Sequence, residues 1–88
     1  MKVSRYHQKL LNRERFNKLM EQSFALAMIR EEVYAKAKCG PKYWAVITQQ
    51  LRNDPNFAGC EINITSVESL NDFYSKVKAE CKELLTQI

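Results

Sequence analysis

The shortage of glycine and proline is the feature that most constrains how this chain can fold. Its 88 residues contain only two glycines and two prolines, and neither type occurs before Gly40. Because these residues are the strongest breakers of regular structure, the sequence predicts long, continuous helices. We expect an all-α domain, residues 1–88, that has little more than the minimum size for a single core. Three main helices are predicted in a small bundle, at about 4–38, 42–52 and 66–87, with an extended connection near 57–64.

The first predicted helix has apolar residues on a wide arc. Leu19, Leu26 and Val33 recur every seven residues, and a second set follows at steps of three and four, namely Phe16, Met20, Phe24 and Ala27. An arc this wide is typical of a helix with neighbours on more than one side. Ser4 is a candidate N-cap for this helix.

The boundary between the first two helices falls at Gly40 and Pro41. We expect Gly40 to end the first helix as a left-handed C-cap, because glycine has no Cβ to clash in that conformation. Pro41 then opens the second helix, where its fixed φ suits the first turn. Lys36 and Lys38 are predicted to lie in the last turn of the first helix, where positive charge suits the helix dipole.

The predicted connection has the alternation of a β-strand. Cys60, Ile62 and Ile64 alternate with polar residues, which is a strand pattern. No second strand is predicted, so we interpret the segment as an extended connection that could pair with another subunit.

The last predicted helix has the most regular pattern in the chain. Thr65 and Glu68 fit a capping box at its start. The apolar residues that follow form an unbroken heptad stripe of Val67, Leu70, Tyr74, Val77, Cys81, Leu84 and Ile88. Such a stripe indicates either a core face within the chain or a seam between the subunits of a homo-oligomer, and both interpretations stay open.

Several classes of function lack a signal in the sequence. No apolar run is long enough to span a membrane, and the N-terminus has no signal-peptide core, so we expect a cytoplasmic protein. The possible zinc ligands are not at the close spacings of zinc sites, so no metal or other cofactor is expected; these are His7, Cys39, Cys60 and Cys81. His7 has basic sequence neighbours, and the sequence shows no carboxylate or nucleophile at a spacing typical of a general base. No phosphate-binding loop or catalytic motif is present, and we expect no catalytic residues and no enzyme activity.

Charge is concentrated at the N-terminus. The net charge is +4, and residues 1–41 carry nine Lys or Arg and four Glu. Arg5, Lys9 and Arg13 are one turn apart on a helix, with Tyr6 adjacent. Basic groups bind phosphates, and an aromatic ring can stack on a base. The face could therefore bind a nucleic acid, a nucleotide or an acidic protein surface, or it could be a solvated face that binds nothing.

A second candidate binding site follows the break at Pro41. Tyr43 and Trp44 could anchor the corner between two helices. Alternatively they could form a stacking platform, with Lys42 beside them and free backbone N–H groups at the helix start. The candidate ligand-binding residues are therefore Arg5, Tyr6, Lys9, Arg13, Lys42, Tyr43 and Trp44.

One resemblance to a known family rests on the order of these features. Tyr6, a long helix rich in Ala and Met, a short break and then "KYWAVI" at 42–47 resemble the small helical anti-CBASS proteins of tailed phages. The resemblance covers about residues 6–48. It implies an oligomeric, non-enzymatic sponge for cyclic oligonucleotides, with Tyr6 as a stacking residue. The family's phosphate-contacting lysine has no counterpart, because Glu21 takes its place and Lys18 is only nearby.

The sequence thus predicts a small, non-catalytic binding protein that engages a phosphate-bearing or acidic partner through its basic N-terminal helix. A phage counter-defence factor fits this description. The alternatives are a protein inhibitor or oligomeric adaptor that uses the 66–87 helix, and a cyclic-oligonucleotide sponge.

Overall fold

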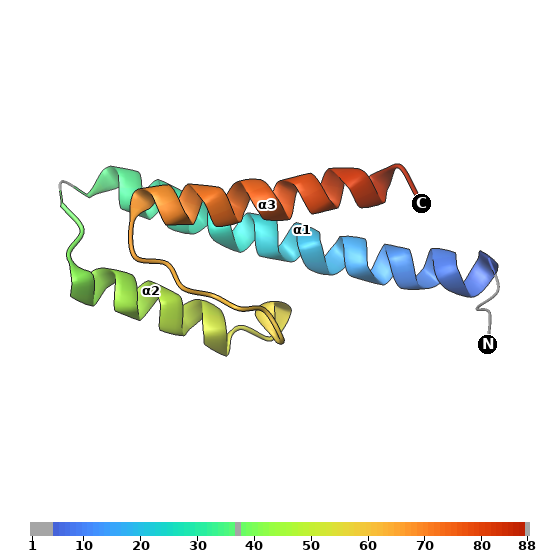
Figure 1. Cartoon of the computed structure of the whole chain (residues 1–88), viewed down its shortest axis with the longest axis horizontal. Helices are drawn as coiled ribbons and strands as arrows, with labels where there is room; N and C mark the ends of the chain where they lie inside the picture. Colours follow the sequence, from blue (N-terminus) through green and yellow to red (C-terminus); the bar gives the residue numbers. More distant parts are fainter. Residues whose placement is uncertain (1–4, 37, 88) are drawn as a thin grey trace.

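The computed structural model describes residues 5–36 and 38–87, and in them the chain is all-α as predicted. Its elements are α1 (Arg5–Ala35), α2 (Pro41–Asn53), the short 3₁₀ helix η1 (Pro55–Phe57) and α3 (Val67–Leu85). They form an elongated bundle of about 50 × 21 × 15 Å in which α3 runs antiparallel to α1 (Figure 1). Ser4 and Ile88, named above as a helix cap and as the end of the heptad stripe, lie outside the described residues.

The main seam of the bundle lies between α1 and α3. Leu19, Leu26 and Val33 of α1 are buried, as the seven-residue repeat predicted. The stripe on α3 is also mostly buried within the chain, at Leu70, Val77, Cys81 and Leu84. Leu26 and Leu70 are both fully buried, so the core interpretation of the α3 stripe is confirmed for these positions. Val67 at the start of the stripe is 37% exposed and Tyr74 is half-buried, and Leu85 beside the stripe is exposed.

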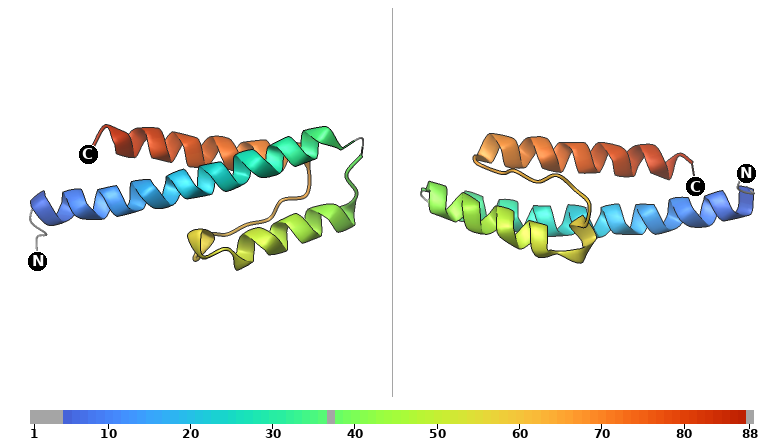
Figure 2. Two further views of the ribbon diagram at one scale, coloured as in Figure 1. Left: turned by 180° about the vertical axis from the view of Figure 1, so that it is seen from behind. Right: turned by 60° about the horizontal axis from the view of Figure 1, so that its bottom comes forward.

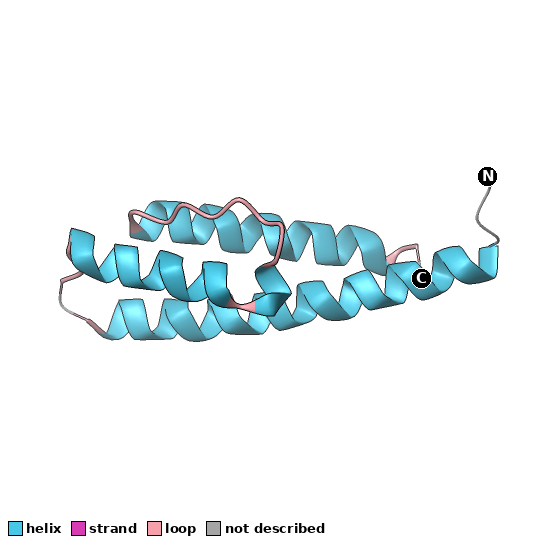
Figure 3. Cartoon of the chain, turned by 90° about the horizontal axis from the view of Figure 1, so that it is seen from below, coloured by secondary structure: helices cyan, strands magenta, loops and turns pink. Residues whose placement is uncertain are grey.

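The predicted connection runs between α2 and α3, on the side of the bundle away from α1 (Figure 3). Ile62 and Ile64 are each only 2% exposed, whereas Glu61, Asn63 and Thr65 face solvent. The alternation read from the sequence is therefore confirmed at Ile62 and Ile64 but not at Cys60, which is exposed, and the described residues contain no strand. The segment acts as a fourth element of the core because two helices on either side bury its apolar side chains.

The start of this connection is fixed by η1. Asp54 caps the 3₁₀ helix by accepting a hydrogen bond from the backbone N–H of Asn56 at 2.9 Å. The buried Gln22 of α1 donates to the backbone oxygen of Asn56, and Phe57 is buried in the core. Gly59 follows with φ +82°, a conformation that glycine adopts without steric cost.

The predicted C-cap role of Gly40 is wrong. α1 ends at Ala35, so Lys36 and Lys38 lie beyond its last turn. Gly40 is the N-cap of α2, with φ −96° and ψ 175°. Its carbonyl accepts from the backbone N–H groups of Tyr43 and Trp44. The reason is steric, because the ring of Pro41 forces the preceding residue into extended backbone.

The predicted capping box of α3 is displaced by one residue. Ser66, not Thr65, is the N-cap, and its Oγ accepts from the N–H of Ser69 at 3.1 Å. The Oγ of Ser69 accepts in turn from the N–H groups of Ser66 and Thr65, both at 3.0 Å. This one hydroxyl satisfies two amides at the helix start, which explains why Ser69 replaces Glu68 in the box.

Replacing the cap tests this assignment. We expect Ser66→Ala to lower the free energy of unfolding by about 1 kcal/mol, because the N–H of Ser69 loses its acceptor. Thr65→Ala is the matched control and should change it by less than about 0.5 kcal/mol. Urea unfolding followed by circular dichroism measures both. A larger loss of stability for the Thr65 variant would show that Thr65 is the N-cap, as predicted from the sequence.

Candidate functional site

The first turns of α1 form the N-terminal overhang, which we define as residues 5–13. α3 ends before it reaches these residues, so they project beyond the body of the bundle (Figures 1 and 2). Most of them are exposed on every side of the helix. The overhang arises because α1 has 31 residues and α3 has only 19.

The overhang brings together four of the residues predicted to bind a ligand. Arg5, Lys9 and Arg13 are exposed and one helical turn apart, and Tyr6 beside them is 71% exposed. Within residues 5–36 and 38–87, the ion pair found is Arg15–Glu80, at 3.7 Å. The three cations of the overhang are therefore not neutralised by a described acidic residue, and their positive field faces solvent.

The other three predicted residues lie at the opposite end of the bundle. Lys42, Tyr43 and Trp44 occupy the first turn of α2. Trp44 and Val33 border the same surface hollow, and α1 rises about 40 Å between Tyr6 and Val33 at 1.5 Å per residue. Within one chain, the two groups of predicted ligand-binding residues are therefore too far apart to form a single site.

Trp44 anchors the corner between α1 and α2. Its side chain is 6% exposed, and the Tyr43 ring meets it edge-on at a centroid distance of 5.6 Å. The Nζ of Lys36 lies 4.9 Å from the centroid of the Tyr43 ring. The core-anchor interpretation is therefore correct for Trp44. Little of the indole is exposed, which leaves less support for its use as an open stacking platform. Lys42 is exposed beside this corner.

The hydroxyl of Tyr43 is a buried polar group without a hydrogen-bond partner in the described chain. Desolvation raises the pKa of Tyr43 above its usual value of 10.0, and the negative charges of Glu32 and ionised Cys39 raise it further. A buried, unpaired hydroxyl is costly. Tyr34 shows the opposite effect, because its hydroxyl accepts a hydrogen bond from Asn71 at 2.9 Å and lies near Arg30, which together lower its pKa.

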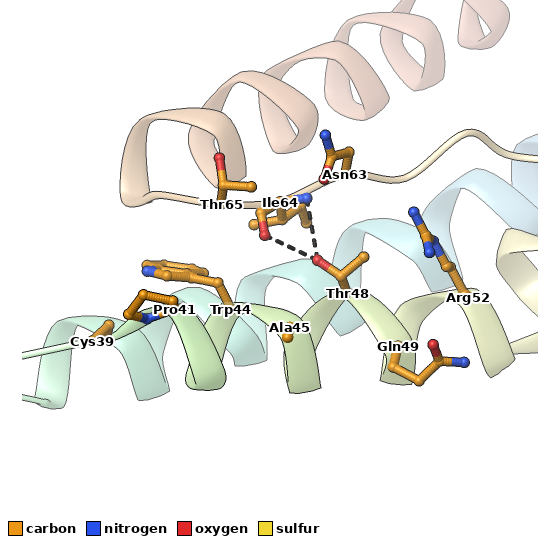
Figure 4. Close-up of a pocket in the computed structure, with 10 residues that line it drawn as sticks. All are labelled: Cys39, Pro41, Trp44, Ala45, Thr48, Gln49, Arg52, Asn63, Ile64 and Thr65. Atoms are coloured by element: carbon orange, nitrogen blue, oxygen red, sulfur yellow. Dashed lines mark hydrogen bonds between the residues drawn. The ribbon is translucent and has the colours of Figure 1, made fainter.

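A cavity with a volume of about 680 Å³ lies between α2 and the segment 63–65 (Figure 4). Successive turns of α2 form one side of it, and residues 63–65 of the connection form the other. The lining residues are Cys39, Pro41, Trp44, Ala45, Thr48, Gln49, Arg52, Asn63, Ile64 and Thr65. Sequence reasoning missed all of them except Trp44. The signal was present in the four-residue spacing of Trp44, Thr48 and Arg52, which places all three on one side of α2.

The polar groups in this cavity already hold the connection in place. Thr48 Oγ1 donates to the backbone oxygen of Ile64 at 2.9 Å and accepts from its N–H at 3.2 Å. Arg52 donates to the backbone oxygen of Ile62 through Nε at 3.1 Å and Nη2 at 2.8 Å. The segment 62–64 thus pairs with side chains of α2 where a strand would pair with another strand. The lining contains no carboxylate and no imidazole, so the cavity has no acid–base pair.

The three cysteines lie apart and are free thiols. Cys39 is half-buried, Cys60 is exposed, and Cys81 is buried in the seam between α1 and α3. In the described part of the chain, no group of three or more His, Cys, Asp or Glu side chains could hold a metal ion. None of the described helices has the length and apolarity needed to cross a membrane.

Comparison of the chain with protein-family models, curated proteins and solved structures finds no match. The resemblance to anti-CBASS sponges therefore stays a prediction. The functional argument rests on the geometry of the chain itself.

The clamp between α2 and the connection can be tested at Thr48. We expect Thr48→Val to lower the free energy of unfolding by about 1–3 kcal/mol, because both backbone polar groups of Ile64 lose their partner while the shape is kept. Val46→Thr is the reverse exchange at an exposed position of α2 and should stay within about 0.5 kcal/mol. Urea unfolding compares the two variants. Equal values would show that water replaces the hydroxyl without cost.

The two perturbed tyrosines predict opposite effects of alkaline pH. The raised pKa of Tyr43 contributes stability below pH 10 that is lost as the pH rises through the folded-state value. Tyr43→Phe should therefore reduce the loss of stability between about pH 9 and about pH 11, on either side of the usual tyrosine pKa of 10.0. The lowered pKa of Tyr34 works in the other direction, so Tyr34→Phe should make the loss steeper. Urea midpoints across this range measure both effects, and identical slopes would contradict the assignment.

Proposed function

We propose that this protein is a non-catalytic binding protein whose N-terminal overhang engages a phosphate-bearing partner. The observation that carries the proposal is the exposed set of Arg5, Lys9 and Arg13, one turn apart on a helix that projects from the bundle. No described acidic residue forms an ion pair with them. Arg15, two residues nearer to the body of the bundle along the helix, is by contrast already paired with Glu80.

Several properties of the overhang favour phosphate over other anions. A row of cations at helical spacing follows a chain of phosphates, and binding releases the counterions that surround such a chain. Tyr6 is 71% exposed beside this row, and a base stacked on an aromatic ring contributes about 1–3 kcal/mol. An acidic protein surface would use the charges but not the ring. A nucleic acid or a nucleotide would use both.

The narrower hypotheses fit the same surface to different degrees. A cyclic oligonucleotide combines phosphates with bases, so a sponge in a phage counter-defence system is a special case of this proposal. The adaptor hypothesis, which relies on the stripe of α3, has less support. α1 already covers four of the stripe's residues, as described above, and its exposed apolar remainder is small.

Affinity for a short labelled single-stranded oligonucleotide tests the proposal. Binding should weaken with added salt, and Arg5→Gln together with Lys9→Gln should weaken it at constant salt. Each lost phosphate contact lowers the slope of log affinity against log salt by about 0.7, so the double variant should lose about 1.4. Fluorescence anisotropy at four salt concentrations gives these slopes.

The matched control removes the same charge elsewhere. Lys76→Gln with Lys82→Gln neutralises two exposed cations of α3 and should leave the slope unchanged. Equal losses in both double variants would mean that only net charge matters, which contradicts a site on the overhang. A cyclic oligonucleotide that raises the melting temperature strongly, while a linear one does not, would select the sponge.

A further inference from the structure

α1 has a second apolar stripe, on the face turned away from α2 and α3. The residues that face the body are Leu19, Leu26 and Val33. On the opposite side, a continuous heptad series at steps of four and three runs through Tyr6, Leu10, Arg13, Asn17, Met20, Phe24, Ala27 and Glu31. Of the wide arc predicted for this helix, Phe16 and Met20 pack against the core of the chain, whereas Phe24 is exposed to solvent.

Large apolar side chains on this face are exposed to solvent. Phe24 is 56% exposed, Met28 70% and Leu10 41%, and Tyr6 continues the stripe into the overhang. Met20 and Ala27 between them are half-buried. Exposed aromatic and methionine side chains in a row along one helix are typical of an interaction surface. A repeat of seven residues matches a helical partner, because it keeps one seam in contact along a supercoil.

We propose that the partner is a second copy of this chain, whose α1 packs antiparallel against α1 around a two-fold axis at the level of Gln22. Gln22 lies midway between Arg13 and Glu31, so the axis places Arg13 against Glu31 of the partner subunit. Symmetry repeats the pair at the other end of the interface. Arg13 and Glu31 are both exposed, and neither forms an ion pair within the described chain.

The same axis aligns the remaining positions of the stripe. Met20 faces Phe24 of the partner subunit at the centre, and Asn17 faces the partner's Ala27. Leu10 lies opposite the partner's Tyr34, which is 58% exposed. In each layer, a residue at the a position of the heptad in one subunit meets a residue at the d position in the other. This pairing is the one that antiparallel coiled coils require. The apolar layers are therefore flanked by two ion pairs.

Other arrangements lose this complementarity. A parallel dimer in register places Arg13 against Arg13 of the partner subunit and Glu31 against the partner's Glu31, which are repulsive contacts. Moving the antiparallel register by one heptad sets Arg13 against Phe24 of the partner subunit or carries it beyond the end of α1. Charged positions on an apolar stripe lower affinity but fix register and orientation in this way.

The dimer also has a consequence that rests on the proposed function. Its register brings the Tyr6 turn of one subunit alongside the residues that follow Ala35 in the other. Arg5 and Lys9 thus lie at the end of the bundle where the partner's Lys38 and the partner's Lys42 are exposed. Arg13 is not part of this composite site, because its charge is paired with Glu31 of the partner subunit. The two parts of the predicted site, about 40 Å apart in one chain by helix length, then meet across the interface as a single basic site for phosphate.

Charge exchange between positions 13 and 31 tests the dimer. Sedimentation velocity in the presence of a reductant, which prevents disulfides through the exposed Cys60, should show a dimer for the wild type. Arg13→Glu or Glu31→Arg alone should raise the dimer dissociation constant about tenfold or more, because each creates two like-charge contacts. An equimolar mixture of the two variants should restore dimers, and so should the double variant R13E/E31R.

Lys82→Glu, a reversal on α3, is the control and should leave the dimer unchanged. Both exchanged side chains are exposed, so circular dichroism should show intact helices in every variant. A wild-type chain that stays monomeric at high concentration would overturn the proposal. Single variants without effect, or a mixture that does not recover, would overturn it equally.

The composite phosphate site has a separate test. Glu31→Arg adds positive charge, so a site on one chain alone should bind the labelled oligonucleotide more tightly. A composite site should bind it more weakly, because this variant separates the subunits. Tighter binding would exclude the composite site. The existence of the dimer would then be decided by the sedimentation experiment alone. The variant R5Q/K9Q should still form dimers but should bind the oligonucleotide more weakly. This result separates the phosphate-site proposal from the dimer proposal.

Discussion

The difference in length between α1 and its neighbours is the constraint on which the other features depend. α1 has 31 residues, whereas α2 has 13 and α3 has 19. The buried seam around Leu26 and Leu70 fixes α3 along part of α1 and cannot extend beyond the end of α3. Basic residues before this point therefore project into solvent. α3 and η1 supply the main contacts of α1 within the chain, and Leu10, Phe24 and Met28 of α1 are left exposed.

The connection between α2 and α3 shows how a small chain completes its core without another helix. Ile62 and Ile64 supply apolar side chains at the spacing of a strand, and their backbone polar groups need partners. Thr48 and Arg52 provide these partners for the Ile62 oxygen and for both polar groups of Ile64. The cavity beside them is a consequence of this arrangement. Most of its charged and hydroxyl groups are committed to the fold, which is why the overhang is the better candidate for binding.

Sequence reasoning was reliable where a single helix determines the outcome. The three helices, the buried stripe of α3 and the extended connection were all predicted, because each depends on periodicity within a short segment. The caps were harder to predict. Gly40 and Ser66 have their roles because of steric contact with Pro41 and a hydroxyl contact with Ser69, and several residue types compete for such positions. The cavity was missed because it depends on how α2 meets residues 63–65, a tertiary contact that no local pattern encodes.

The dimer proposed through the outer face of α1 gives a reason for the polar residues in the apolar stripe there. A stripe made only of residues like Met20 and Phe24 would associate in several registers and with many partners. Arg13 and Glu31 lie at equal distances from Gln22, so one antiparallel register neutralises both while a parallel one opposes like charges. The cost is a weaker interface, and the gain is a single geometry. In the proposed dimer, this geometry covers the exposed Leu10 and Phe24 of α1 and places a basic overhang at each end of the assembly.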